Sequence, residues 1–292
     1  MCWDIAAELV VCIRFVIMFA SMYSDMNHKT KMSLLVAVFT AALTGLFTTV
    51  QFASAGVQGT DEMATATSAK PIPLKEAKLN IEHNAKDKDT GFQGFLDSEG
   101  WKEMTITGPD GKVLEFEAEG KLGRLGMTEL FFETVEPENA YVPIPKLLKT
   151  LPAGKYKFEG IAIENGKVLG KTAGTALLTH KIPRGPELLT PAEDKVVSPD
   201  KDLLMSWKPV KKALDGSAVK IIAYQLIIEK DEEPQPNMIG KFGLSMYLPP
   251  EVTSMSIPKK FLEPGTDYEW EVLAIEESGN QTLMSSSFST SD

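Results

Sequence analysis

Cysteine is almost absent from the chain. The 292 residues include two cysteines, Cys2 and Cys12, and both precede the cleavage point expected after Ala55. The chain that remains after cleavage has no thiol, which excludes disulfides and thiolate metal sites. Many secreted eukaryotic modules of this size are held by disulfides, so an exported protein without them fits a bacterial envelope or a secreted bacterial context better.

Catalytic motifs are also lacking. The chain has three histidines, of which His83 and His180 follow the expected cleavage point. It has no Gly-x-Ser-x-Gly, no His-Glu-x-x-His and no glycine-rich phosphate loop. A carboxylate pair for glycoside hydrolysis could be drawn from many acidic residues, but nothing in the sequence selects one. We therefore expect no enzyme and no cofactor, and the alternative is a secreted carbohydrate-active hydrolase or its accessory domain.

Basic residues are in deficit. The chain has 30 Lys and Arg against 40 Asp and Glu, a formal net charge of -10. An acidic surface repels phosphate backbones, so nucleic acid is excluded as a partner. Because no run of five or six like charges occurs, no polybasic arm is expected either.

The N-terminal segment has the pattern of an export signal. Lys29 and Lys31 precede the uncharged, mostly apolar stretch 33–50, and small residues follow at Ala53 and Ala55. This is the order of a cleavable signal peptide, so we expect export to the periplasm or the medium, with no membrane attachment after cleavage. A transmembrane anchor is the alternative, because the apolar stretch is close to spanning length.

The position of the true start codon stays open. Residues 1–25 hold a partly apolar stretch that is interrupted by Glu8 and Arg14. We interpret residues 1–55 as a signal peptide with an over-extended start, and Met1, Met26 and Met32 are the candidate first residues. Residues 56–75, rich in Gly, Thr, Ala and Ser, are predicted to form a flexible leader.

Residues 76–181 have the texture of a β-sandwich. Seven or eight short strands are separated by turn signals, of which Gly-Pro-Asp-Gly at 108–111 and Asn165-Gly166 predict tight hairpins. A shift of the apolar alternation at Gly160 predicts a β-bulge, and residues 143–151 predict a short helical turn. This part of the chain resembles, in style only, secreted immunoglobulin-like bacterial modules. Residues 182–186, with two prolines, are predicted to be a stiff linker.

Residues 186–292 carry a more specific pattern. Strands are expected at 203–207, 219–229, 252–257, 266–276 and 283–288, whereas 231–250 is irregular. The stretch Leu262-Glu-Pro-Gly-Thr-Asp-Tyr268 before a strand predicts a tyrosine corner, in which the Tyr268 hydroxyl contacts the preceding turn. On these residues the segment resembles a fibronectin type III domain. The resemblance implies a second sandwich, so the overall prediction is an all-β chain of two tandem β-sandwich domains, 76–181 and 186–292.

One polar loop has the residue types of a calcium site. Asn84, Asp87 and Asp89 precede Gly91, and Asp97 follows close enough in sequence to complete a shell of oxygen ligands. The loop matches no known calcium loop and contains two lysines. The alternative interpretation is a solvated polar turn.

Trp101 is the candidate contact residue for a ligand. It follows the polar run Asp-Ser-Glu-Gly, which would place it at a turn, where an exposed ring could bind a sugar or anchor an interface. The alternative is that the ring belongs to the core, as most aromatic side chains do.

These observations favour a non-catalytic, exported binding or structural module. Its partner would be an envelope or extracellular protein, or a polysaccharide. Aromatic residues gathered around Trp101 would favour a sugar, and a flat apolar edge strand would favour a protein. The identity of the ligand, the oligomeric state and the organism do not follow from the sequence.

Overall fold

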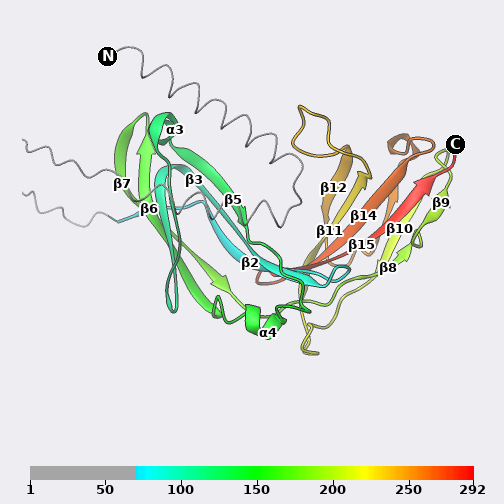
Figure 1. The fold of residues 1–292 in the computed structure, drawn as a ribbon, viewed down its shortest axis with the longest axis horizontal. Coiled ribbons are helices and arrows are strands. Elements are labelled where there is room, and N and C mark those ends of the chain that lie inside the picture. Colours follow the sequence, from blue (N-terminus) through cyan, green and yellow to red (C-terminus); the bar gives the residue numbers. More distant parts are fainter. Residues whose placement is uncertain (1–69) are drawn as a thin grey trace, which may run out of the picture. The chain divides into compact units, whose positions relative to one another are not determined.

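The computed structural model describes residues 70–292, and these residues form an all-β fold (Figure 1). The predicted signal peptide, at residues 1–55, lies outside the described residues, as does most of the predicted leader. Across 70–292, no helix combines the length and the apolar character that crossing a membrane requires.

The first half of the described chain contains seven strands and two short helices. They are β1 (Ile72–Pro73), β2 (Glu76–Asn84), β3 (Asp89–Gly108), β4 (Gly111–Glu117), α3 (Gly120–Leu125), β5 (Met127–Glu133), α4 (Ile144–Leu147), β6 (Gly154–Glu164) and β7 (Lys167–Leu178). Helix α4 lies within the stretch predicted to form a helical turn.

The long strand β3 pairs with different strands along its two parts. Its first part pairs with β2 and β5, and its second part pairs with β4 and β6. The register shifts between Asp97 and Trp101, where Gly100 approaches its neighbour so closely that a Cβ would lie 2.4 Å from the Ile163 carbonyl oxygen. Because β1 pairs with β7 and leads directly into β2, the sheet wraps around a core that includes Ile81, Trp101 and Phe158.

Both predicted hairpins of this half are present. Gly108 pairs with Gly111, and Asn165 and Gly166 have φ angles of 49° and 77°, as a two-residue turn of the primed type requires. The predicted bulge lies elsewhere: Gly160 pairs regularly with Thr172, and the register shifts between Ala162 and Ile163. Gly160 instead allows β6 to approach β3 closely, since a Cβ at Gly160 would lie 2.1 Å from the Glu103 carbonyl oxygen.

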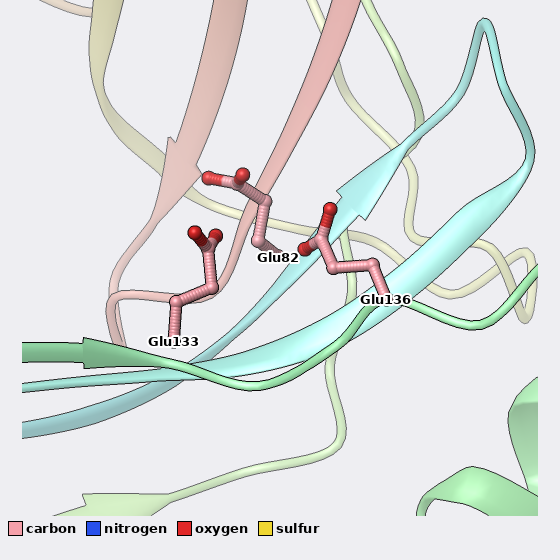
Figure 2. Close-up of side chains that lie close together, drawn as sticks. All are labelled: Glu82, Glu133 and Glu136. Atoms are coloured by element: carbon pink, nitrogen blue, oxygen red, sulfur yellow. The ribbon is translucent and has the colours of Figure 1, made fainter. Parts of the chain in front are cut away.

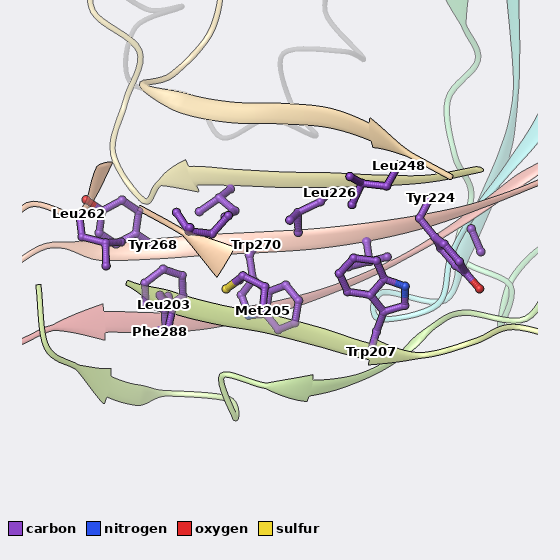
Figure 3. Packing of buried hydrophobic residues seen from close by; sticks show 14 residues of the cluster. Leu203, Met205, Trp207, Tyr224, Leu226, Leu248, Leu262, Tyr268, Trp270 and Phe288 are labelled. Atoms are coloured by element: carbon purple, nitrogen blue, oxygen red, sulfur yellow. The ribbon is translucent and has the colours of Figure 1, made fainter. Parts of the chain in front are cut away.

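The second half is a sandwich of two sheets. Its strands are β8 (Glu187–Thr190), β9 (Lys195–Val197), β10 (Leu203–Lys208), β11 (Ile221–Lys230), β12 (Gly243–Leu248), β13 (Ser254–Ile257), β14 (Asp267–Glu276) and β15 (Gln281–Thr290). One sheet has the order β13-β10-β8, and the facing strands have the order β15-β14-β11-β12. Trp207, Trp270 and Phe288 are buried between the two sheets (Figure 3).

The predicted tyrosine corner is confirmed. The backbone N–H of Glu263 donates to the Tyr268 hydroxyl at 2.9 Å, and the Tyr268 ring stacks on Phe288 with ring centroids 5.1 Å apart. Three strands facing four, in this order and with this corner, are the arrangement of a fibronectin type III domain. The second half of the described chain therefore has that fold. Strand β12 lies in the stretch 231–250, which is less regular in sequence than the family pattern and where the position of a strand was left open.

The two cores are joined by strand pairing. Strand β15 pairs in parallel with β2, from Gln281 opposite Glu82 to Leu283 opposite Asn84, so one sheet continues through both halves. Asn280 is buried beside this pairing, where its Oδ1 accepts the Ile81 N–H at 2.9 Å. Its Nδ2 donates to the backbone oxygens of Thr179 and Lys181, at 3.0 Å each.

The predicted linker is part of this junction. Ile182, Pro183 and Pro186 are buried, and the Thr282 hydroxyl donates to the Pro183 carbonyl oxygen at 2.6 Å. The domain limits 76–181 and 186–292 remain predictions, since the described residues 70–292 fall within one compact unit.

Candidate functional site

Three glutamates converge on one face of the sheet. Glu82 of β2, Glu133 at the end of β5 and Glu136 just beyond it point toward one another (Figure 2), and their nearest carboxylate oxygens lie within 4.8 Å of one another. Strands β2 and β5 flank β3, so Gly91 of β3 lies between them. A Cβ at Gly91 would lie 2.8 Å from Glu136 Cγ, so the glycine makes room for this side chain.

Neutral amides, and no cations, contact this glutamate cluster (Glu82, Glu133 and Glu136). Gln93 Nε2 donates to Glu133 at 2.8 Å, and Gln281 Nε2 donates to Glu82. Glu136 Oε1 is buried and has no hydrogen-bond partner. No salt bridge within residues 70–292 involves any of the three glutamates.

The surroundings favour the protonated form of Glu136 and of Glu82. Burial, together with the charges of Glu82 and Glu133, raises the pKa of Glu136 to about 7. Burial also raises the pKa of Glu82, against the hydrogen bond from Gln281, which lowers it. The cluster is therefore suited to holding a proton near neutral pH.

The glutamate cluster lies apart from the two hollows described below. Its nearest oxygens lie within 4.8 Å of one another, closer than the about 5–5.5 Å of a retaining glycosidase pair, and such a pair must also lie in a cleft that admits a sugar. Two hollows in the described surface lie elsewhere, one beside Lys86 and Pro191 and the other beside Arg124 and Val168. Neither is lined by a glutamate of the cluster.

The predicted calcium ligands do not converge. Asp89 and Asp97 are on the same straight part of β3, opposite Asn84 and Glu76 respectively. Eight residues of extended strand separate them by about 27 Å. The four-residue shell is therefore wrong, because Asp97 cannot reach the others.

The remaining three residues form a polar turn. Asn84 Oδ1 accepts the backbone N–H groups of Lys86 and Asp87, at 2.9 and 3.0 Å, and Asn84 Nδ2 donates to Asp87 Oδ2 at 2.8 Å. Asp89 Oδ1 is buried without a partner, and burial, followed by the charge of Asp87, raises the pKa of Asp89. The Asn84 oxygen is thus already used within the turn, as the alternative interpretation expected.

Trp101 is a core residue. Its side chain is 2% exposed, and it pairs with Met127 of β5 and with Ala162 of β6. Because Trp101 belongs to the buried core cluster that includes Ile81 and Phe158, its ring offers no face to a ligand, and the prediction of ligand binding at Trp101 is corrected to the core alternative.

The edge of the second sandwich offers a different surface. Strand β12 ends the order of the long sheet, and its sequence Gly-Leu-Ser-Met-Tyr-Leu carries no charge. Next to it, Ile239 and Phe242 are exposed, and Tyr247 within the strand is 68% exposed. The other edges are short or charged: β1 has two residues and ends in Pro73, and β4 includes Lys112 and Glu115.

Comparison with known proteins gives likenesses of fold only. No family profile and no curated protein matches the chain. Among solved structures, a two-domain fibronectin type III segment of chicken tenascin matches at 13% identity, covering 74% of this chain and 99% of that one, with a TM-score of 0.26.

Two further structures match in the same range. The fibronectin(III)-like modules of Clostridium thermocellum CbhA match at 11% identity, covering 75% of this chain and 93% of theirs, with a TM-score of 0.30. The FN1–FN3 domains of chicken CNTN1 match at 10% identity, covering 75% of this chain and 68% of theirs, with a TM-score of 0.29. At such scores, the fold assignment rests on the strand order and the tyrosine corner.

Proposed function

We propose that this protein is an exported, non-catalytic binding module that acts through contact with another protein. The observation that carries the proposal is the uncharged edge strand β12 beside the exposed side chains of Ile239 and Phe242. Proteins usually protect such edges with charges, prolines or bulges, because a free edge pairs with other chains. An unprotected edge therefore supports a role in binding through strand addition.

Polysaccharide is the less supported partner. A sugar site of the kind considered from the sequence needs an exposed aromatic platform, and the Trp101 ring is buried. The alternative of a carbohydrate-active hydrolase also has less support, since the glutamate cluster lies outside the two described hollows.

The proposal can be tested on envelope preparations of the native host. The chain from Gly56 onward is incubated with untreated envelopes, with protease-treated envelopes and with periodate-oxidised envelopes, and sedimented protein is quantified. We expect binding that is lost after proteolysis and kept after periodate oxidation. Loss of binding after periodate alone would identify a polysaccharide partner, and no binding to any preparation would overturn the proposal.

A further inference from the structure

We infer that strand β12 takes up an extended strand of a partner protein that carries a lysine or arginine opposite Gly243. The inference rests on the proposed function and specifies the chemistry of the partner. Strand β12 pairs with β11 on one side, and no strand of residues 70–292 pairs with it on the other. That second side is where an added strand would lie.

The peptide groups that would bind the added strand can be assigned. The Lys230 N–H donates to the Phe242 carbonyl oxygen at 3.0 Å, which makes these two residues a hydrogen-bonded pair at the start of β12. Because such pairs alternate along an antiparallel ladder, Gly243, Ser245 and Tyr247 turn their N–H and C=O groups away from β11. Partner residues bonded to these groups place their side chains on the same face of the sheet.

That face carries unpaired negative charge. Glu229 of β11 lies opposite Gly243 on one side and opposite Glu269 of β14 on the other, and Glu271 is two residues further along β14. Within the described chain no salt bridge involves these three glutamates. Like charges directly opposite each other destabilise a sheet, so the pair Glu229 and Glu269 is better satisfied by a cation from outside.

Gly243 places no side chain between the outer edge of β12 and these carboxylates. It has no side chain between Glu229 and the outer edge, and a Cβ there would lie 2.9 Å from Glu229 Cγ. An added strand would lie two strand spacings, about 10 Å, from β11, a distance that an extended lysine or arginine side chain and the Glu229 side chain span together. A cationic residue opposite Gly243 can therefore reach Glu229, while a residue opposite Tyr247 meets an exposed aromatic ring.

A second copy of this chain, paired through the same strand β12, does not supply the required cation. In a symmetric antiparallel pair centred on Ser245, Gly243 of one copy would face Tyr247 of the other, and β12 contains no cation. The chain also has a net charge of -10, so two acidic faces would be brought together. The charge of the face therefore selects a different, basic partner strand.

The test uses two synthetic peptides and the chain from Gly56 onward. The first is capped Val-Tyr-Val-Thr-Val-Lys-Val-Lys with a fluorescent label, and the second has glutamate in place of both lysines. Binding is measured by fluorescence anisotropy at low salt. We expect saturable binding of the lysine peptide and about fivefold weaker binding of the glutamate peptide, because it sets like charges opposite each other.

Two variants locate the bound peptide. Ser245→Pro removes an outward N–H and the side-chain bond from Gln225 Nε2 to Ser245 Oγ, but no backbone bond to β11. The fold is therefore kept, which circular dichroism checks, and binding is expected to weaken about tenfold. Glu229→Gln is expected to remove most of the preference for lysine, whereas Glu251→Gln, at an exposed carboxylate in the turn after β12, keeps it.

The outcomes separate this inference from the proposed function. No saturable binding, equal affinity for both peptides, or an undiminished affinity in Ser245→Pro would each overturn the inference, even where envelope binding through a protein is observed. Self-association in sedimentation that disappears in Ser245→Pro would overturn it as well, by making a second copy the occupant of the edge.

Discussion

Replacing Glu136 by glutamine should stabilise the protein at pH 8 and leave its stability at pH 4 unchanged. Glutamine has nearly the shape of a protonated glutamate and cannot ionise. In the folded chain, the Glu136 carboxylate lies against Glu82 and Glu133, and one of its oxygens is buried without a partner. The ionised form is therefore the costly one, and the substitution removes it.

The sign and the size follow from the pKa. Burial raises the pKa of Glu136 from 4.5 to about 7, so between these values the folded chain holds a proton that the unfolded chain has released. The free energy of unfolding then falls as the pH rises through this window. This shift of the pKa corresponds to about 3 kcal/mol in the free energy of unfolding, before any allowance for solvent. Since the side chain is partly exposed, screening by solvent reduces it to about 1–2 kcal/mol.

Thermal unfolding of the wild type and of Glu136→Gln, measured between pH 4 and 8 with a chelator present, tests this directly. The Tm of the variant should exceed that of the wild type by about 2–8 °C at pH 8, and the gap should close toward pH 4. Glu251→Gln, at an exposed carboxylate outside the cluster, serves as the control. Parallel pH profiles for the wild type and Glu136→Gln would refute the reasoning.

Three further substitutions test other features. Asn280→Ala should lower the free energy of unfolding by about 2–4 kcal/mol in urea, because it leaves the Ile81 N–H and other buried groups unpaired; an unchanged midpoint would contradict this junction. Tyr268→Phe should cost about 1–2 kcal/mol with the fold intact, because only the bond to the Glu263 N–H is lost; no loss would argue against the corner. Asp97→Ala should leave the Tm and any response of the Tm to calcium as in the wild type, and a calcium response that depends on Asp97 would contradict the strand geometry.

The features that the sequence predicted depend on neighbouring residues. The turn at Asn165-Gly166 and the corner formed by Tyr268 each involve a few consecutive positions, so residue type alone decides them. The position of strand β12 stayed open because it follows a loop with two prolines and several polar residues, and because its own alternation is weak. It is ordered by pairing with the strongly apolar β11.

The candidate site depends on contacts between distant residues. Glu82 meets Glu133 and Glu136 only because Gly91 leaves space above β3, and no local pattern indicates which distant carboxylates share that space. Trp101 shows the opposite problem. Its polar neighbours suggested exposure, but packing against distant core residues such as Ile81 and Phe158 buries the ring.

The parallel pairing of β2 with β15 has a mechanical consequence. Force applied between Glu76, at the start of β2, and Thr290, at the end of β15, pulls the two strands in opposite directions along their common axis. Their hydrogen bonds are then loaded in shear, all at once, before either core is pulled apart. Two independent domains would unfold in two steps. This chain should instead resist as a single element until the β2–β15 pairing ruptures, and single-molecule stretching would record one dominant force peak.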